Sequence, residues 1–229
     1  MMPVRRSLHL ALPVPLLFVA ALLGAALFPS TGCRSAEQVP GAVVMDEKAH
    51  EAWEIALVEM RIDKNEEFTK PDASPLPAAA IPSFEGLNYY FPKPDLRFRT
   101  KLVAEAKADT VTLTKRKGNQ VKYVRKGAVA FTYLDKVYRL GVFGLVGGDN
   151  PDYLWLPFYD ATSGKDTYGG GRYLDLKLDA DGQVEVDFNY AYNPLCDYNP
   201  EAYNCTLPPR ENTLPFAVEA GEKLYAEAH

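Results

Sequence analysis

The feature that most constrains the fold of this chain is an apolar period of two that runs through much of its second half. Val111 and Leu113 alternate with threonines, Val121 and Tyr123 alternate with basic residues, and further runs follow, each bounded by Gly, Asn or Asp. Such alternation is typical of antiparallel strands with one buried face. We therefore expect a mainly β (α+β) fold, in which about eight or nine antiparallel strands, the last over residues 213–219, form a barrel- or sandwich-like sheet.

A helical period precedes the strands. Trp53, Leu57 and Met60 recur with the spacing of one helix face, which predicts a helix over Glu47–Lys64 that packs on the sheet through this face. Six prolines follow between residues 71 and 94, and each one removes a backbone donor and fixes φ. We expect this second segment to be an extended connector that also lies on the sheet.

The first 32 residues have the composition of a secretory signal peptide. Arg5 and Arg6 form a basic start, and an uninterrupted apolar run of 13 residues follows over Leu16–Phe28. A membrane-spanning helix needs about 20 apolar residues. A signal peptide over residues 1–32 is therefore the better interpretation, while an uncleaved anchor stays open.

The apolar run is followed by Ser30-Thr31-Gly32-Cys33, which resembles a bacterial lipoprotein box, although Ser30 stands where such boxes usually carry leucine. The resemblance implies cleavage before Cys33 and attachment to a membrane through a lipid on that cysteine. Arg34 implies sorting to the outer membrane, so we expect an envelope protein that faces the periplasm. A lipid-anchored tether over residues 33–44 and a single globular domain over residues 45–229 complete the predicted organisation.

Charge and cysteine content exclude several classes of function. The formal net charge is −5 at pH 7, and because an acidic surface repels a phosphate backbone, nucleic acid is not an expected partner. Three cysteines and three histidines are too few for a zinc finger or an iron–sulfur site, so we expect neither a metal nor another cofactor. No sequence feature specifies an oligomeric state.

One hairpin can be predicted to the residue. Two alternating runs joined by a short loop each have one apolar and one polar face, and apolar positions must oppose apolar ones. Leu178 is therefore expected opposite Val184, with Gly182 supplying the left-handed conformation that the loop needs. The same register would place Asp175 opposite Asp187, where two carboxylates repel unless solvent or a cation separates them.

Arg172 is the exception in this hairpin, because its position lies on the apolar face. A guanidinium there needs a buried acceptor, and Asp160 is the candidate partner. Alternatively, the glycines at 169–171 could form a bulge that turns Arg172 toward solvent.

Three blocks in the second half of the chain carry specific motifs: LPFYDATSGKDTYGGGRYLDL from residue 156, DFNYAYNPLCDYNPEAYNCTLPP from residue 187, and AVEAGEK from residue 217. They resemble the bacterial and archaeal family named for the domain of unknown function 1684, over about residues 50–225. The matching positions include Phe158, Asp160, Thr162, Gly164, Thr167, Tyr168, Gly171, Arg172, Leu174, Asp187, Phe188, Asn189, Tyr192, Asn193, Pro194, Cys196, Cys205, Asn212 and Ala220-Gly221-Glu222. The resemblance implies a fold and the place of a site, and it implies no particular chemistry.

The two cysteines of the second block, Cys196 and Cys205, lie close together in a loop rich in Tyr, Asn and Pro. An exported protein meets an oxidising compartment, so we interpret the pair as a disulfide. Two reduced and merely buried thiols stay open as the alternative.

A patch of polar and aromatic side chains near strand ends is the candidate ligand-binding site. Its members are Asp160, Thr162, Tyr168, Arg172, Asp187, Asn189, Tyr190, Tyr192 and Asn193. Aromatic faces beside Asn, Asp and Arg can bind a polar organic ligand, and paired acids can bind a divalent cation or act in acid–base catalysis. Alternatively, these side chains satisfy the backbone of the long 190–212 loop.

Two hypotheses about function follow. In the first, the β domain of a lipid-anchored envelope protein binds a small polar ligand or an envelope component without catalysis. In the second, the protein is a hydrolase that uses the carboxylates of Asp160 and Asp187, with or without a divalent cation. Whether the protein is an enzyme stays open at this point.

Overall fold

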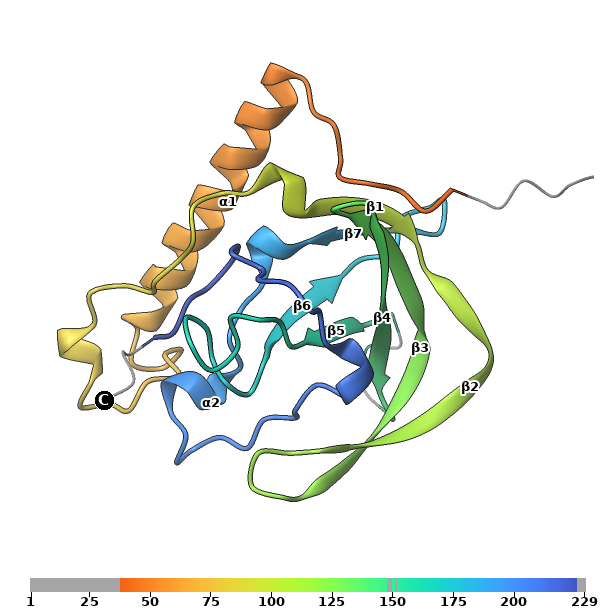
Figure 1. Cartoon of the computed structure of the whole chain (residues 1–229). Helices are drawn as coiled ribbons and strands as arrows, with labels where there is room; N and C mark the ends of the chain where they lie inside the picture. Colours follow the sequence, from red (N-terminus) through yellow and green to blue (C-terminus); the bar gives the residue numbers. More distant parts are fainter. Residues whose placement is uncertain (1–37, 148–149, 151, 226–229) are drawn as a thin grey trace, which may run out of the picture. The chain divides into compact units, whose positions relative to one another are not determined.

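The computed structural model describes residues 38–147, 150 and 152–225 (Figure 1). The predicted signal peptide, the predicted lipidation site Cys33 and the start of the predicted tether lie outside the described residues. Over the described chain the elements are α1 (Glu47–Phe68), η1 (Ile81–Ser83), η2 (Pro94–Leu96), β1 (Arg97–Lys101), β2 (Val103–Thr114), β3 (Gln120–Tyr133), β4 (Lys136–Leu145), β5 (Leu154–Phe158), β6 (Arg172–Leu176), β7 (Gln183–Asp187), η3 (Phe188–Tyr190), α2 (Leu195–Tyr198) and η4 (Arg210–Asn212).

The strands form two antiparallel sheets, which confirms the mainly β prediction. One sheet has the order β2-β3-β4-β5-β6, and the other pairs β1 with β7. Figure 1 shows β2 and β3 as a long curved hairpin on one side of the domain and α1 on the opposite side. The arrangement is sandwich-like and does not close into a barrel, because β6 and β7 are the ends of separate sheets.

The described residues contain seven strands, fewer than the eight or nine expected. The difference includes residues 213–219, which make a single bridge between Thr213 and Tyr159 instead of a strand. Pro215 cannot donate a hydrogen bond, and the Val218 amide donates to the Asp160 carboxylate at 3.2 Å instead of to a neighbouring strand. The segment therefore forms no strand, although the Leu214 amide donates to the Tyr159 carbonyl at 2.8 Å and the Ala161 amide donates to the Phe216 carbonyl at 3.0 Å.

Alternation along the strands builds the main core between the sheets. Phe98 of β1 stacks on Phe131 of β3 with ring centroids 4.4 Å apart, and Phe188 contacts both rings edge-on. All three are fully buried, and each contributes about 1.5–3 kcal/mol relative to exposure. The β1–β7 pair is thereby fixed against the larger sheet.

Helix α1 begins where the sequence predicts and ends one turn later. The Asp46 carboxylate accepts a hydrogen bond from the Ala49 amide at 2.8 Å, and Trp53 and Leu57 are buried as expected. The helix continues to Phe68 because that ring packs edge-on against Tyr198, with centroids 4.9 Å apart. This last contact is long-range in sequence and gives no local signal.

The 180–182 turn confirms part of the predicted hairpin. Leu178 bridges to Val184, and Gly182 has φ +72°. Beyond this bridge, however, the two strands separate. Asp175 lies opposite Trp155 of β5, and Asp187 lies opposite Arg97 of β1, so the prediction that the two acids face each other in a ladder is wrong.

The reason is that alternation determines which face of a strand is buried but not which edge receives a partner. The acids of β7 instead meet β1, where Glu185 accepts hydrogen bonds from Arg97 at 2.6 and 3.0 Å. Strand β6 pairs with β5 over its whole length. The separation of β6 from β7 positions the candidate site.

Candidate functional site

The separation of β6 and β7 leaves a hollow of about 210 Å³ between them, which we name the β6–β7 hollow. It is lined by Leu174, Asp175, Leu176, Lys177, Glu185, Asp187 and Tyr190. A larger groove of about 470 Å³, which we name the α1–β6 groove, shares Asp175 and Tyr190 with it. The α1–β6 groove is lined by Met60, Lys64, Tyr89, Asp175, Tyr190, Ala191, Tyr192 and Glu222.

Asp175 is the exposed acceptor common to both spaces. Its carboxylate accepts hydrogen bonds from the Tyr153 hydroxyl at 2.8 Å and from the Tyr192 hydroxyl at 3.0 Å. Burial raises the pKa of both tyrosines, and the charge of Asp175 adds to the rise, so both remain donors. The carboxylate is therefore held in place while it remains open to a further donor from a ligand.

Lys64 and Glu222 connect α1 to the C-terminal segment at the wall of the α1–β6 groove. The ammonium donates to Glu222 Oε1 at 2.5 Å and lies 5.2 Å from the centroid of the Tyr192 ring. The other carboxylate oxygen, Oε2, accepts from the Asn193 amide at 2.8 Å and from the Tyr198 hydroxyl. Glu222 is 2% exposed, so this network is a buried support for the groove.

Asp187 lines the β6–β7 hollow but uses most of its hydrogen-bonding capacity within the protein. Oδ2 accepts from Trp53 Nε1 at 2.7 Å, and Oδ1 accepts from the amide and the side chain of Asn189 at 2.9 and 2.8 Å. Burial raises the pKa of Asp187, while these hydrogen bonds oppose the rise. The carboxylate thus fixes α1, through Trp53, beside the hollow.

Three other predicted site residues form a separate buried network. Arg172 is fully buried and donates to Asp160 Oδ2 at 3.0 Å and to the carbonyl oxygens of Val218, Ala220 and Glu222, which confirms Asp160 as its partner. The alternative in which Arg172 turns toward solvent is wrong. Asp160 Oδ1 accepts from the amide and the hydroxyl of Thr162 at 2.8 and 2.6 Å.

The remaining predicted residues are divided between the groove and its supports. Tyr192 lines the α1–β6 groove. The Asn189 side chain instead accepts a hydrogen bond from the Lys93 amide at 2.7 Å and donates one to the Lys93 carbonyl oxygen at 2.9 Å. Asn193 donates to Asp197 at 2.8 Å and to the Lys223 carbonyl at 2.7 Å. Tyr168 is half-buried and lines neither space. The structure therefore brings together Tyr190, Tyr192 and Asp187 and leaves Asp160, Thr162 and Arg172 apart from them.

Asp197 supplies a pH-dependent prediction. Burial raises its pKa from 3.8 to about 6, the Glu222 charge adds to the rise, and hydrogen bonds from the Tyr225 amide and Asn193 oppose it. The folded chain therefore binds this proton more tightly than the unfolded chain, and stability is lost as the pH rises from about 4 through 6. Asp197→Asn removes the ionisation. We therefore expect the free energy of unfolding of Asp197→Asn, relative to that of wild type, to increase by about 2 kcal/mol between pH 4 and pH 7.5.

Urea unfolding at the two pH values measures this difference, with Asp181→Asn at an exposed position as the control. An Asp197→Asn curve that runs parallel to wild type at both pH values would contradict the assignment.

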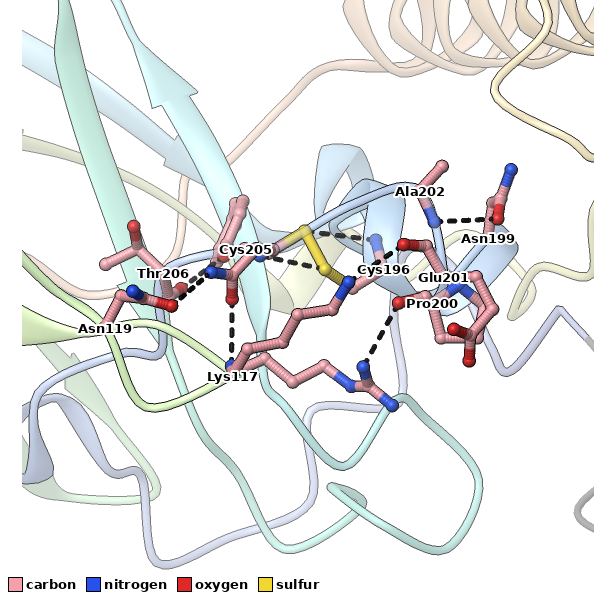
Figure 2. The surroundings of a disulfide bond; sticks show 12 residues. Lys117, Asn119, Cys196, Asn199, Pro200, Glu201, Ala202, Cys205 and Thr206 are labelled. Atoms are coloured by element: carbon pink, nitrogen blue, oxygen red, sulfur yellow. Dashed lines mark hydrogen bonds between the residues drawn. A yellow bond between two sulfur atoms is a disulfide. The ribbon is translucent and has the colours of Figure 1, made fainter.

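A disulfide joins Cys196 and Cys205, as predicted, nine positions apart in sequence (Figure 2). Closing this short loop contributes about 2–3 kcal/mol in a chain-entropy account. The loop is also attached to the β2–β3 turn, where Lys117 Nζ donates to the Glu201 carbonyl oxygen at 2.8 Å (Figure 2). The backbone amide of Lys117 donates to Asn204 Oδ1 at 2.9 Å. The long loop is thereby fixed beside the outer face of the larger sheet.

Over 38–147, 150 and 152–225, no group of three or more His, Cys, Asp or Glu side chains is arranged to hold a metal ion. Within the same ranges, no helix combines the length and the apolar composition that crossing a membrane requires.

Comparison with known families decides the relationship. The family described as a protein of unknown function (DUF1684) matches residues 82–223. This range contains all residues that line the β6–β7 hollow and the α1–β6 groove except Met60 and Lys64. The chain belongs to the DUF1684 family. The segment 50–81, which also resembles the family, lies outside the matched range.

A solved structure supports this assignment of the DUF1684 chain. It is the solution NMR structure of the uncharacterised protein from gene locus rrnAC0354 of Haloarcula marismortui, which is 34% identical over 80% of this chain and 100% of that one, with a TM-score of 0.62. No curated protein matches the chain. The relationship therefore supports the fold and carries no activity.

Sequence reasoning missed four residues that line the α1–β6 groove of this DUF1684 chain: Met60, Lys64, Tyr89 and Glu222. The helical spacing places Met60 on the predicted core-facing stripe, and Lys64, one turn further on the same face, is the available signal. Tyr89 lies in the proline-rich connector and bridges to Glu222. Only the tertiary fold brings these segments together.

Proposed function

We propose that this protein is an exported lipoprotein, held at the periplasmic side of the outer membrane by a lipid on Cys33, whose β domain binds a small polar ligand or an envelope component without catalysis. We place the ligand in the α1–β6 groove. The proposal combines the leader and the Gly32-Cys33 pair with the groove on the folded domain.

The observation that carries the binding proposal is the composition of the α1–β6 groove. Three tyrosine side chains, Tyr89, Tyr190 and Tyr192, line one space of about 470 Å³ together with the exposed carboxylate of Asp175. Aromatic surface beside a few fixed polar groups is the usual lining of sites for small organic molecules. Tyrosine faces suit the apolar faces of a sugar or similar molecule, and Asp175 suits a hydroxyl or ammonium donor.

The hydrolase hypothesis receives no comparable support. It requires an accessible carboxylate at Asp160, whereas the Asp160 side chain is 1% exposed and both of its oxygens accept hydrogen bonds from Arg172, Thr162 or Val218. Asp187 is 4% exposed and is bound by Trp53 and Asn189. We therefore propose binding and not hydrolysis.

A ligand screen tests the binding proposal. Full-length protein is melted with a panel of sugars, sugar acids, amino acids and phosphates, and at least one member is expected to raise the Tm of wild type. Asp175→Ala with Tyr190→Ala should lower the affinity for that ligand at least tenfold, while Asp181→Ala, an exposed acid on the neighbouring turn, should leave it unchanged. A panel without any stabilising member, or a double variant that binds like wild type, would refute the proposed site.

Export and lipidation are tested separately. Cells that express the wild-type chain with radioactive palmitate should incorporate label into the protein, and Cys33→Ser should abolish the label, since the thiol is the proposed acceptor. The disulfide between Cys196 and Cys205 is in keeping with export, because such bonds persist in oxidising compartments. Label retained by Cys33→Ser, or wild-type protein recovered from cytosol with its leader intact, would contradict this part of the proposal.

A further inference from the structure

Arg61 of α1 differs from the other arginines that are not solvent-exposed. In the part of the chain that the structure describes, four arginines are buried or half-buried: Arg61, Arg97, Arg125 and Arg172. The last three each donate to a carboxylate, at 2.6 Å from Arg97 to Glu185, 3.1 Å from Arg125 to Glu105 and 3.0 Å from Arg172 to Asp160. Arg61 has only a neutral acceptor, the Tyr90 carbonyl oxygen at 3.1 Å.

The other two nitrogens of this guanidinium have no partner. Nε and Nη2 of Arg61 are covered from solvent and make no hydrogen bond within the described residues. Burial lowers the pKa of Arg61, against the opposing charges of Glu222 and Asp187. Two buried guanidinium nitrogens without an acceptor are unfavourable for the folded state, and unsatisfied groups of this kind call for an explanation such as a ligand.

The position of Arg61 relates it to the α1–β6 groove. Its guanidinium carbon lies 4.5 Å from the centroid of the Tyr89 ring, and Tyr89 lines the groove together with Met60 and Lys64, which flank Arg61 on α1. Nε and Nη2 form one edge of the planar fork, and this edge matches the two oxygens of a carboxylate or phosphate group. Lys64 does not compete for such a group, because Glu222 already neutralises its ammonium at 2.5 Å.

We infer that Arg61 binds the oxyanion of a small hydroxylated acid, a carboxylate or a phosphate ester, whose hydroxyl groups reach Asp175 across the groove. This inference rests on the proposed binding function and adds the charge class of the ligand. Since Nε and Nη2 are covered from solvent, binding of the anion requires a neighbouring side chain to move, and the Tyr89 ring lies nearby, with its centroid 4.5 Å from the guanidinium carbon. The two polar ends of the groove then select a molecule that carries both an oxyanion and a hydrogen-bond donor.

The test compares three sugars that share the glucose ring and differ at carbon 6, namely glucose, glucuronate and glucose 6-phosphate, each titrated into full-length protein by calorimetry. We expect wild type to bind at least one of the two anions tenfold or more tightly than glucose, and the preferred anion distinguishes a carboxylate from a phosphate site. Arg61→Met should remove the preference. Arg99→Met, which deletes an exposed arginine paired with Asp179 at 2.6 Å, should retain it.

A second measurement separates binding from a structural role. Because Arg61→Met removes a half-buried charge that has no carboxylate partner, its Tm without ligand should equal or exceed that of wild type, whereas a structural arginine would lower the Tm on replacement. Arg61→Gln serves as the second variant if Arg61→Met does not fold. An anion preference that survives in either variant, or wild type that binds neither anion better than glucose, would overturn the inference. If all three sugars bind wild type equally and Asp175→Ala weakens all three, the groove function stands and only the role of Arg61 fails.

Discussion

Arg172→Met is expected to lower the free energy of unfolding by about 3–5 kcal/mol, one of the largest effects of any single substitution in this domain. The substitution leaves the Asp160 carboxylate buried without its counter-charge and removes the donors to the Val218, Ala220 and Glu222 carbonyls. Desolvated groups that lose a partner cannot recover hydration in a fully buried site. Urea unfolding followed by tryptophan fluorescence measures the change.

The matched control for Arg172→Met is Arg99→Met. Arg99 also pairs with an aspartate, Asp179 at 2.6 Å, but its side chain is 54% exposed, so solvent screens the pair and the loss of stability should be far smaller than in Arg172→Met. Equal losses in the two variants would show that the Asp160–Arg172 network is not the buried anchor of the C-terminal segment that the structure describes.

Glu222→Ala is expected to cost a comparable amount, about 3–5 kcal/mol, because it breaks the buried link between α1 and the C-terminal segment. The substitution leaves the Lys64 ammonium, the Tyr198 hydroxyl and the Asn193 amide without the acceptor they share. These groups come from two separate segments, α1 and residues 193–198, so the loss should also loosen the wall of the α1–β6 groove. The free energy of unfolding from urea curves checks the first effect.

Hydrogen exchange checks the second effect, since the amides of α1 should lose protection in Glu222→Ala before those of the sheet. Glu219→Ala is the control, because this glutamate lies in the same segment, is 57% exposed and is 3.7 Å from Lys93. A Glu222→Ala protein as stable as Glu219→Ala would disprove the role of this network.

The fold class could be predicted from the sequence because the period of the apolar residues changes from helical to alternating. The spacing of Trp53 and Leu57 identifies the buried face of α1. The positions of Leu178, Gly182 and Val184 predict the register of one turn correctly. The edges used by β6 and β7 could not be predicted, since Asp175 and Asp187 are equally compatible with facing each other or with separate partners. Their partners, on β5 and β1, are distant in sequence.

The candidate site was predictable only in part for a related reason. The motif blocks identified Tyr192 and Asp187, which line the two spaces, but the same blocks contain Asp160 and Arg172, which support the fold. A single sequence does not distinguish a residue that forms a buried ion pair from a residue that contacts a ligand. Tyr89 could not be predicted as a site residue, because the proline-rich connector has no hydrophobic period from which the orientation of a side chain could be inferred.

The most direct test of the account is to map a bound ligand on the protein by amide NMR, with glucuronate and, in a second titration, glucose 6-phosphate added to isotope-labelled full-length chain. The account predicts that the perturbed amides gather at residues 60–64, 89–90, 175, 190–192 and 222, around the α1–β6 groove. Perturbations that gather instead beside the disulfide, at the hollow lined by Tyr123, Trp155 and Cys205, or none at millimolar concentration, would contradict it.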